Sequence, residues 1–265
     1  MGCLETKDLK TTKATLTRKD YHDRKKQRKR NEGDHLMSHF SVAVFHREGQ
    51  SIESLLAPFD ENKQVEPYIE YTRQEAIEFA RKHIPDAESV TDDKCWEMMA
   101  EGRKTDKDGN IYSTYNPDSK WDWWEVGGRF NKMLQVGKVL RDEAKVKDID
   151  FSQDLETYED ALDFWDVVID GKPKTPGKNY FTLFSEKYYK DYYGDRETYA
   201  RYMSHFRTYA VITPDGKWYA EGDMGWFGCS SATPEEFKKW CEHYKEIFLD
   251  NADPDWILTI VDCHI

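Results

Sequence analysis

Tyr115-Asn-Pro-Asp-Ser-Lys-Trp-Asp-Trp-Trp-Glu-Val-Gly-Gly-Arg129 is the densest run of aromatic and charged residues in the chain, and it holds three of the nine tryptophans. An extended backbone from Lys120 to Val126 would place alternate side chains on opposite faces. The two faces would carry Trp121, Trp123 and Glu125 on one side, and Asp122, Trp124 and Val126 on the other. Each face then has both a ring and a carboxylate, and the closing glycine pair allows a sharp turn.

Two interpretations of this stretch are open from the sequence. Large rings on both faces are typical of a central strand covered on both sides, and an Asp122–Arg129 ion pair would then satisfy the two charges. Alternatively, the rings stack on a planar or sugar-like ligand while Arg129 holds an anion through two parallel hydrogen bonds. In that pocket the ligand-binding residues would be Lys120, Trp121, Asp122, Trp123 and Arg129.

The composition indicates a globular protein. A length of 265 residues is sufficient for one large domain or two small ones. Charged residues make up 34% of the chain, yet 14% are aromatic, which is enough for a packed core and argues against general disorder. No apolar run has the length of a membrane span and no signal peptide is visible, so we expect no membrane partner. The five cysteines are far apart without a CxxC spacing, which favours a reduced, cytoplasmic protein lacking a structural zinc site.

The net charge of −12 is unevenly distributed. Residues 1–36 hold eleven Lys or Arg against six Asp or Glu, whereas the remainder holds 28 against 45. We expect residues 1–36 to form a mobile basic arm, either a solvated tail or a contact for nucleic acid or an acidic partner. The acidic body repels nucleic acid phosphates and suits docking on a basic protein surface.

Local patterns predict an α+β fold with a largely antiparallel sheet and a ferredoxin-like core. The expected strands are 38–46, 119–136, 207–221 and 256–264, and the expected helices are 72–83, 92–104 and 234–250. Capping boxes at Thr72 to Glu75 and at Thr233 to Glu236 open two of these helices. A helical insertion is expected at about 140–206, and residues 37–265 are expected to form one domain around it.

Titratable residues suggest a second group of site candidates. On the last strand Leu258, Ile260, Asp262 and His264 would share a face. An Asp-x-His pair can supply two metal ligands, or an Asp that orients a His acting as a general base. Further metal ligands would have to come from other segments, with Asp60, Glu61, Glu66, His39 and His46 as the candidates, so the cofactor stays open.

Several short motifs resemble those of a family of uncharacterised proteins common in bacteriophage genomes and prophages. They span Met37 to Ile265 and comprise Met37-Ser-His-Phe-Ser-Val, Leu56-Ala-Pro-Phe-Asp-Glu-Asn62, the Trp-rich stretch through Gly127-Gly-Arg129, Gly222-Asp-Met-Gly-Trp226 and Val261-Asp-Cys-His-Ile265. The basic arm and about 140–206 fall outside them, and Phe130 stands where such relatives have Trp. The resemblance implies a phage protein in the cytoplasm of a bacterial host.

Two function hypotheses follow. In the first, the chain recognises an anionic or nucleotide-like small molecule through its Trp and Arg residues, and Asp262, His264, Asp60 and Glu61 supply catalytic groups around the same cavity. In the second, it is a non-catalytic acidic inhibitor or adaptor that binds a host protein. One concave site that gathers the polar motif residues would favour the first hypothesis, whereas scatter over an acidic surface would favour the second.

Overall fold

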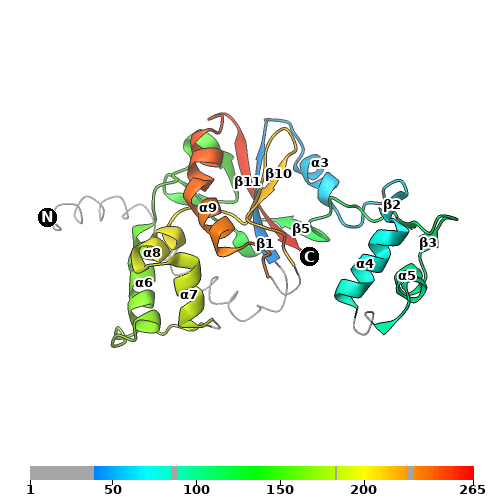
Figure 1. Cartoon of the computed structure of the whole chain (residues 1–265). Helices are drawn as coiled ribbons and strands as arrows, with labels where there is room; N and C mark the ends of the chain where they lie inside the picture. Colours follow the sequence, from blue (N-terminus) through cyan, green and yellow to red (C-terminus); the bar gives the residue numbers. More distant parts are fainter. Residues whose placement is uncertain (1–38, 85–88, 183, 226–228) are drawn as a thin grey trace. The chain divides into compact units, whose positions relative to one another are not determined.

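A computed structural model describes residues 39–84, 89–182, 184–225 and 229–265 (Figure 1). The expected basic arm, residues 1–36, lies outside the described residues. The chain divides into two compact units. The smaller unit is residues 57–119, and the larger one joins the described residues up to Leu56 with residues 120–265. The expectation of one domain over 37–265 stays a prediction.

The larger unit is built on the pairing of the first and last strands. β1 (His39–His46) is rich in β-branched and aromatic residues, and it pairs antiparallel along its whole length with β11 (Ile257–His264). His39 lies directly opposite His264 in this register. Both strands are almost completely buried, as expected for the centre of a sheet.

Shorter strands flank this central pair. β9 (Ala210–Ile212) runs parallel to β1, and a turn at Gly216 returns the chain as β10 (Trp218–Ala220), so the region expected as strand at 207–221 is a hairpin. The sheet order is β10-β9-β1-β11-β5, where β5 is Trp123–Val126, and β8 (Glu143–Lys145) also pairs with β11. All of these pairs except β1 with β9 are antiparallel, so the α+β, largely antiparallel prediction is confirmed. A ferredoxin-like core is not confirmed by this order and stays a prediction.

The glycine pair divides the predicted strand at 119–136. β5 (Trp123–Val126) pairs with β11 and ends where Gly127 and Gly128 adopt φ values of 73° and 47°. Left-handed backbone of this kind is available at low cost only to glycine, and it cannot continue a strand. The turn η3 (Gly128–Phe130) follows, and β6 (Leu134–Val136) belongs to a separate two-stranded sheet with β7 (Val139–Arg141). The prediction of one strand through residue 136 was therefore wrong.

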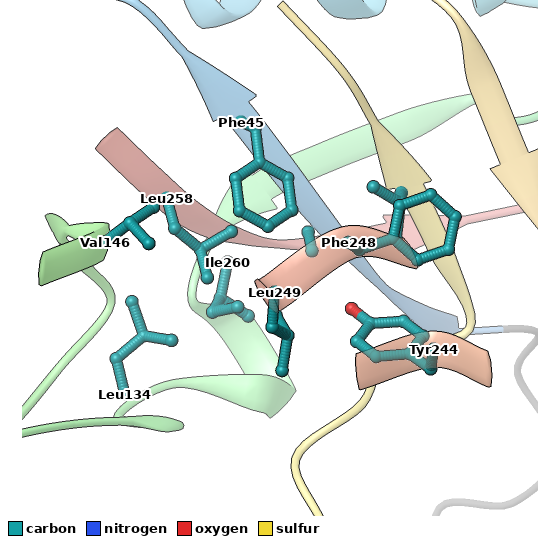
Figure 2. Close-up of a cluster of buried hydrophobic side chains, with 10 residues drawn as sticks. Phe45, Leu134, Val146, Tyr244, Phe248, Leu249, Leu258 and Ile260 are labelled. Atoms are coloured by element: carbon teal, nitrogen blue, oxygen red, sulfur yellow. The ribbon is translucent and has the colours of Figure 1, made fainter. Parts of the chain in front are cut away.

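A helix packs the main core against one face of this sheet. α9 (Pro234–Tyr244) begins with the predicted capping box and continues as the π-helix η7 (Lys245–Asp250), as expected for 234–250. Figure 2 shows Tyr244, Phe248 and Leu249 of this helix pointing toward the strands. Their partners on β1 and β11 are Ala43, Phe45, Leu258 and Ile260. The apolar half of the face predicted for the last strand is therefore core, and Asp262 and His264 extend that face beyond it.

The helical insertion is shorter than predicted. Its helices are α6 (Leu155–Phe164), η5 (Trp165–Ile169), α7 (Glu186–Tyr193) and α8 (Arg196–Ser204). They pack on each other through aromatic side chains that include Trp165, Tyr189 and Tyr199. The start at residue 140 was wrong, because β7 and β8 (Glu143–Lys145) belong to sheets and β8 pairs with β11.

The smaller unit is α+β as well. A three-stranded sheet of β2 (Tyr68–Tyr71), β4 (Ile111–Ser113) and β3 (Lys104–Thr105) is joined by α4 (Arg73–His83) and α5 (Asp92–Ala100). α4 has the predicted capping box. α5 ends at Ala100, earlier than the predicted residue 104, and Gly102 just beyond its end adopts a φ of 71°. A membrane-spanning helix is not found anywhere in the part of the chain that the structure describes.

Candidate functional site

Two histidines lie side by side at the end of the β1/β11 pair. His39 opens β1, His264 closes β11, and cross-strand neighbours point to the same face of a sheet. Their ring centroids are 4.9 Å apart and the ring planes meet at 68°. This is the face that carries the core under α9, so the apolar packing of the sheet gives way here to a polar site.

A buried carboxylate orients the first imidazole. Asp262 is 0% exposed, and its Oδ1 lies 2.8 Å from Nδ1 of His39. Its Oδ2 accepts a hydrogen bond of 2.8 Å from the backbone N–H of Arg129. The two donors offset the cost of burying the charge.

The glycine pair makes that second contact possible. A Cβ on Gly128 would lie 2.5 Å from Cβ of Asp262, so only glycine lets the turn approach the carboxylate this closely. The Gly-Gly-Arg motif therefore serves the site through its main chain. The expected pairing of Asp122 with Arg129, and the expected grip of the Arg129 guanidinium on an anion, stay predictions.

The second imidazole has a carboxylate of its own. Nδ1 of His264 lies 2.7 Å from Oδ1 of Asp122, and the backbone N–H of Asp122 donates to the carbonyl of His264 across 2.9 Å. Asp122 precedes β5, and the two backbone-linked residues hold each other in place. The sequence therefore predicted Asp122, Asp262 and His264 as site candidates, and the structure brings all three together around His39.

The remaining nitrogen of each ring has no hydrogen-bond partner among the described residues. An ionised carboxylate only accepts hydrogen bonds, so Nδ1 of His39 and of His264 carries the proton and Nε2 has the free lone pair. Within the described ranges neither Nε2 has a hydrogen-bond partner, and the only fully enclosed side-chain nitrogen or oxygen without one is Nε1 of Trp121. The His39 side chain is 10% exposed and the His264 side chain is 24% exposed.

The tryptophans of the rich stretch separate into two roles. Trp123 is 47% exposed and packs edge-on against His39 with centroids 6.1 Å apart. Trp121 is 5% exposed and packs against Trp124, so it belongs to the core. The shared face expected for Trp121 and Trp123 stays a prediction, because β5 begins only at Trp123. Lys120 forms an ion pair of 2.9 Å with Asp223.

The loop carboxylates lie in the smaller unit. Oδ1 of Asp60 accepts from the backbone N–H of Asn62, and the Tyr115 hydroxyl lies 3.5 Å from Glu61. The buried Asn116 joins this loop to the start of the Trp-rich stretch, since its amide donates to the carbonyls of Pro58 and Asp60. Convergence of Asp60 or Glu61 with the histidines stays a prediction.

His39 is the residue whose role the sequence missed. It entered only as one possible metal ligand, because its position opposite His264 depends on the pairing of two strands from distant parts of the chain.

A second polar group lies on the other face, where Nε2 of His46 is 3.0 Å from Oγ1 of Thr259, which in turn donates to Glu143. His46 and Thr259 are buried and paired, so this group is structural.

Among the described residues, neither a nucleophilic Cys263 nor a metal cluster of three or more ligands competes with this interpretation. Burial raises the pKa of Cys263 well above its usual range, with a further contribution from the charge of Asp262, and its thiol is buried on the opposite face. In the described parts of the chain, no three or more His, Cys, Asp or Glu side chains are grouped to hold a metal ion.

Comparison of the chain with protein-family models, with curated proteins and with solved structures gave no match. The site is therefore interpreted from its geometry alone.

Proposed function

We propose that the chain binds an anionic, nucleotide-like small molecule at His39 and His264 and acts on it as an enzyme. The observation that carries this proposal is the pair of adjacent imidazoles, each fixed at Nδ1 by its own carboxylate and neither with a partner at Nε2 among the described residues. Carboxylate-oriented histidines of this kind donate and accept protons in general acid–base catalysis. The phage origin and the bacterial cytoplasm expected from the motif resemblance are part of the same proposal.

The surroundings suggest what the ligand looks like. The half-exposed ring of Trp123 stands beside His39 and offers an apolar surface to a planar group. In the imidazolium form, each Nε2 would donate a hydrogen bond to an anionic group, and Arg129, whose main chain holds Asp262, stays a candidate for a second contact with it. A nucleobase on Trp123 with its phosphate at the histidines satisfies both features.

Calorimetric titration of the full chain with inorganic phosphate and with a nucleoside monophosphate tests this proposal. We expect the nucleotide to bind more tightly, because stacking of a base on an aromatic ring contributes about 1–3 kcal/mol. Trp123→Ala should reduce nucleotide affinity to that of phosphate, and His264→Asn should weaken both. His243→Asn is the matched control, since His243 is exposed and Nδ1 contacts only its own helix at Lys239. Binding that is unchanged in His264→Asn contradicts the proposal.

A second candidate function is an acidic inhibitor or adaptor that docks on a basic host protein. It is favoured by the charge outside residues 1–36, where 45 acidic residues stand against 28 basic ones. A partner captured from host lysate should then dissociate with increasing salt and bind His264→Asn as well as the unmodified chain. The two functions are therefore separated by the response to one substitution.

A further inference from the structure

We infer that Nε2 of His39 and Nε2 of His264 together bind one divalent transition-metal ion of the kind that prefers imidazole ligands, such as Zn²⁺ or Co²⁺. The inference rests on the proposed function, because the ion would receive the anionic oxygen of the ligand. It changes the chemistry expected there, from proton transfer by the imidazoles to polarisation of the bound oxygen by the ion.

The spacing of the rings fits joint coordination. A tetrahedral zinc ion held at about 2.0–2.1 Å by one nitrogen of each imidazole would place the two ring centroids about 5 Å apart. The observed separation of the centroids is 4.9 Å. The two residues are directly paired across antiparallel strands, so the backbone holds this spacing before any ion arrives.

The carboxylates have the positions that support metal-binding histidines. A ligating imidazole usually donates its other N–H to a carboxylate, which fixes the ring and makes the ligating nitrogen more basic. Here Asp262 holds Nδ1 of His39 at 2.8 Å and Asp122 holds Nδ1 of His264 at 2.7 Å. Both rings are therefore oriented in the same way, and the two nearby negative charges favour binding of a cation by the imidazoles.

The proposed site has two protein ligands and is open. Three or more clustered ligands are absent from the described residues, so the ion would complete its coordination with water or with the anionic group of the ligand. The side chains of His39 and His264 are 10% and 24% exposed, which leaves an entry path from solvent. An open site of this kind has the free positions that Lewis-acid chemistry on a bound anion needs.

Titration of the metal-free full chain with Zn²⁺ and with Co²⁺ tests the inference. We expect one metal ion to bind per chain with saturation, and the Co²⁺ complex to have an absorption spectrum typical of a low coordination number. The Nε2 resonances of His39 and His264 should shift in ¹⁵N NMR. His39→Asn and His264→Asn should abolish this binding. Asp122→Asn keeps both ligands and should weaken affinity about 10–100-fold, as outer-shell substitutions do. His243→Asn should bind as the unmodified chain does.

The outcomes separate the metal site from the proposed function. The metal site is overturned if no metal ion binds with saturation. It is also overturned if one ion still binds in His264→Asn and the His39 resonances do not shift. Phosphate binding by the zinc-loaded chain that is unchanged in excess EDTA shows that the ion does not receive the anionic oxygen, and it leaves the proposed function standing as acid–base chemistry. Zn²⁺ binding that depends on both histidines without any binding of phosphate or nucleotide supports the metal site and contradicts the proposed function. The NMR shifts are read on the unmodified chain, so the test does not depend on the variants folding.

Discussion

The backbone N–H of Arg129 donates to Oδ2 of Asp262 across 2.8 Å, and this contact joins the Trp-rich stretch to the last strand. Asp262 is completely buried and orients His39 through its other oxygen. The position of the His39 imidazole therefore depends on the main chain of a turn. The residue of that turn that lies against Asp262 is Gly128, which has no side chain.

We expect Gly128→Ala to lower the free energy of unfolding by about 3 kcal/mol or more. A left-handed φ costs a residue with a Cβ about 1–3 kcal/mol, and the new Cβ would in addition collide with Asp262. Urea denaturation measures the effect. Gly137→Ala is the control, because Gly137 has a φ of 53° but a Cβ added to it would meet no atom within 4 Å, so only the backbone cost applies. Equal losses for the two variants would show that the contact with Asp262 does not constrain the turn.

Asn116→Ala should destabilise the smaller unit by about 1–3 kcal/mol, because it leaves the carbonyls of Pro58 and Asp60 without their donor in a buried place. Hydrogen exchange of the amides in β2 and β4 measures the local effect. Asn62→Ala, at an exposed position of the same loop, should change stability by less than about 0.5 kcal/mol. Similar exchange rates in the two variants would contradict a structural role for Asn116.

Thiol reactivity should follow burial. In a Cys3→Ser background we expect a thiol reagent such as DTNB to modify Cys229 rapidly, because it is exposed. Burial raises the pKa of Cys241 to about 12 and that of Cys263 well above its usual range, so both stay protonated and unreactive at neutral pH until the chain unfolds. Mass spectrometry of the modified peptides identifies the sites. Early modification of Cys263 would contradict the closed sheet face on which it lies.

Stability should decrease with increasing pH through the titration of Glu221. Burial raises the pKa of Glu221, and the nearby Arg207 and the hydroxyl of Ser230 only partly counter this. The folded chain then binds a proton more tightly than the unfolded chain does, so this contribution is full below the unfolded value of about 4.3 and is lost as pH rises through the folded pKa. Glu221→Gln should flatten the dependence measured by urea titration at several pH values. Glu235→Gln, at an exposed position of α9, should leave it unchanged.

Local sequence patterns predicted the strand faces and helix starts that are set by residues close together in the chain. Alternation in the last strand correctly placed Ile260, Asp262 and His264 on one face, and the capping box at Thr233 marked the helix that covers it. Alternation did not show that β5 begins only at Trp123, because a strand's first residue is set by its hydrogen-bond partner and not by its own pattern. The site also escaped prediction because His39 pairs across the sheet with a residue far along the chain.

The contribution of Arg129 was hidden for a different reason. Sequence reasoning assigns a role to an arginine through its guanidinium, whereas here the backbone N–H, which nearly every residue possesses, contacts Asp262. The glycines before it were the better signal. A glycine pair beside charged residues indicates a close approach of the main chain, but the sequence does not say which group is approached.

The polar pairs on β1 and β11 also specify how the two strands align. His39 with Asp262 lies near one end of the eight-residue ladder, and His46 with Thr259 lies at the other end on the opposite face. Sliding one strand by a single residue would move every side chain to the other face and separate both pairs at once. Asp262 would then be buried without its donors, a penalty that apolar side chains alone would not impose. The polar residues of the proposed site thus also select the native register of the two central strands.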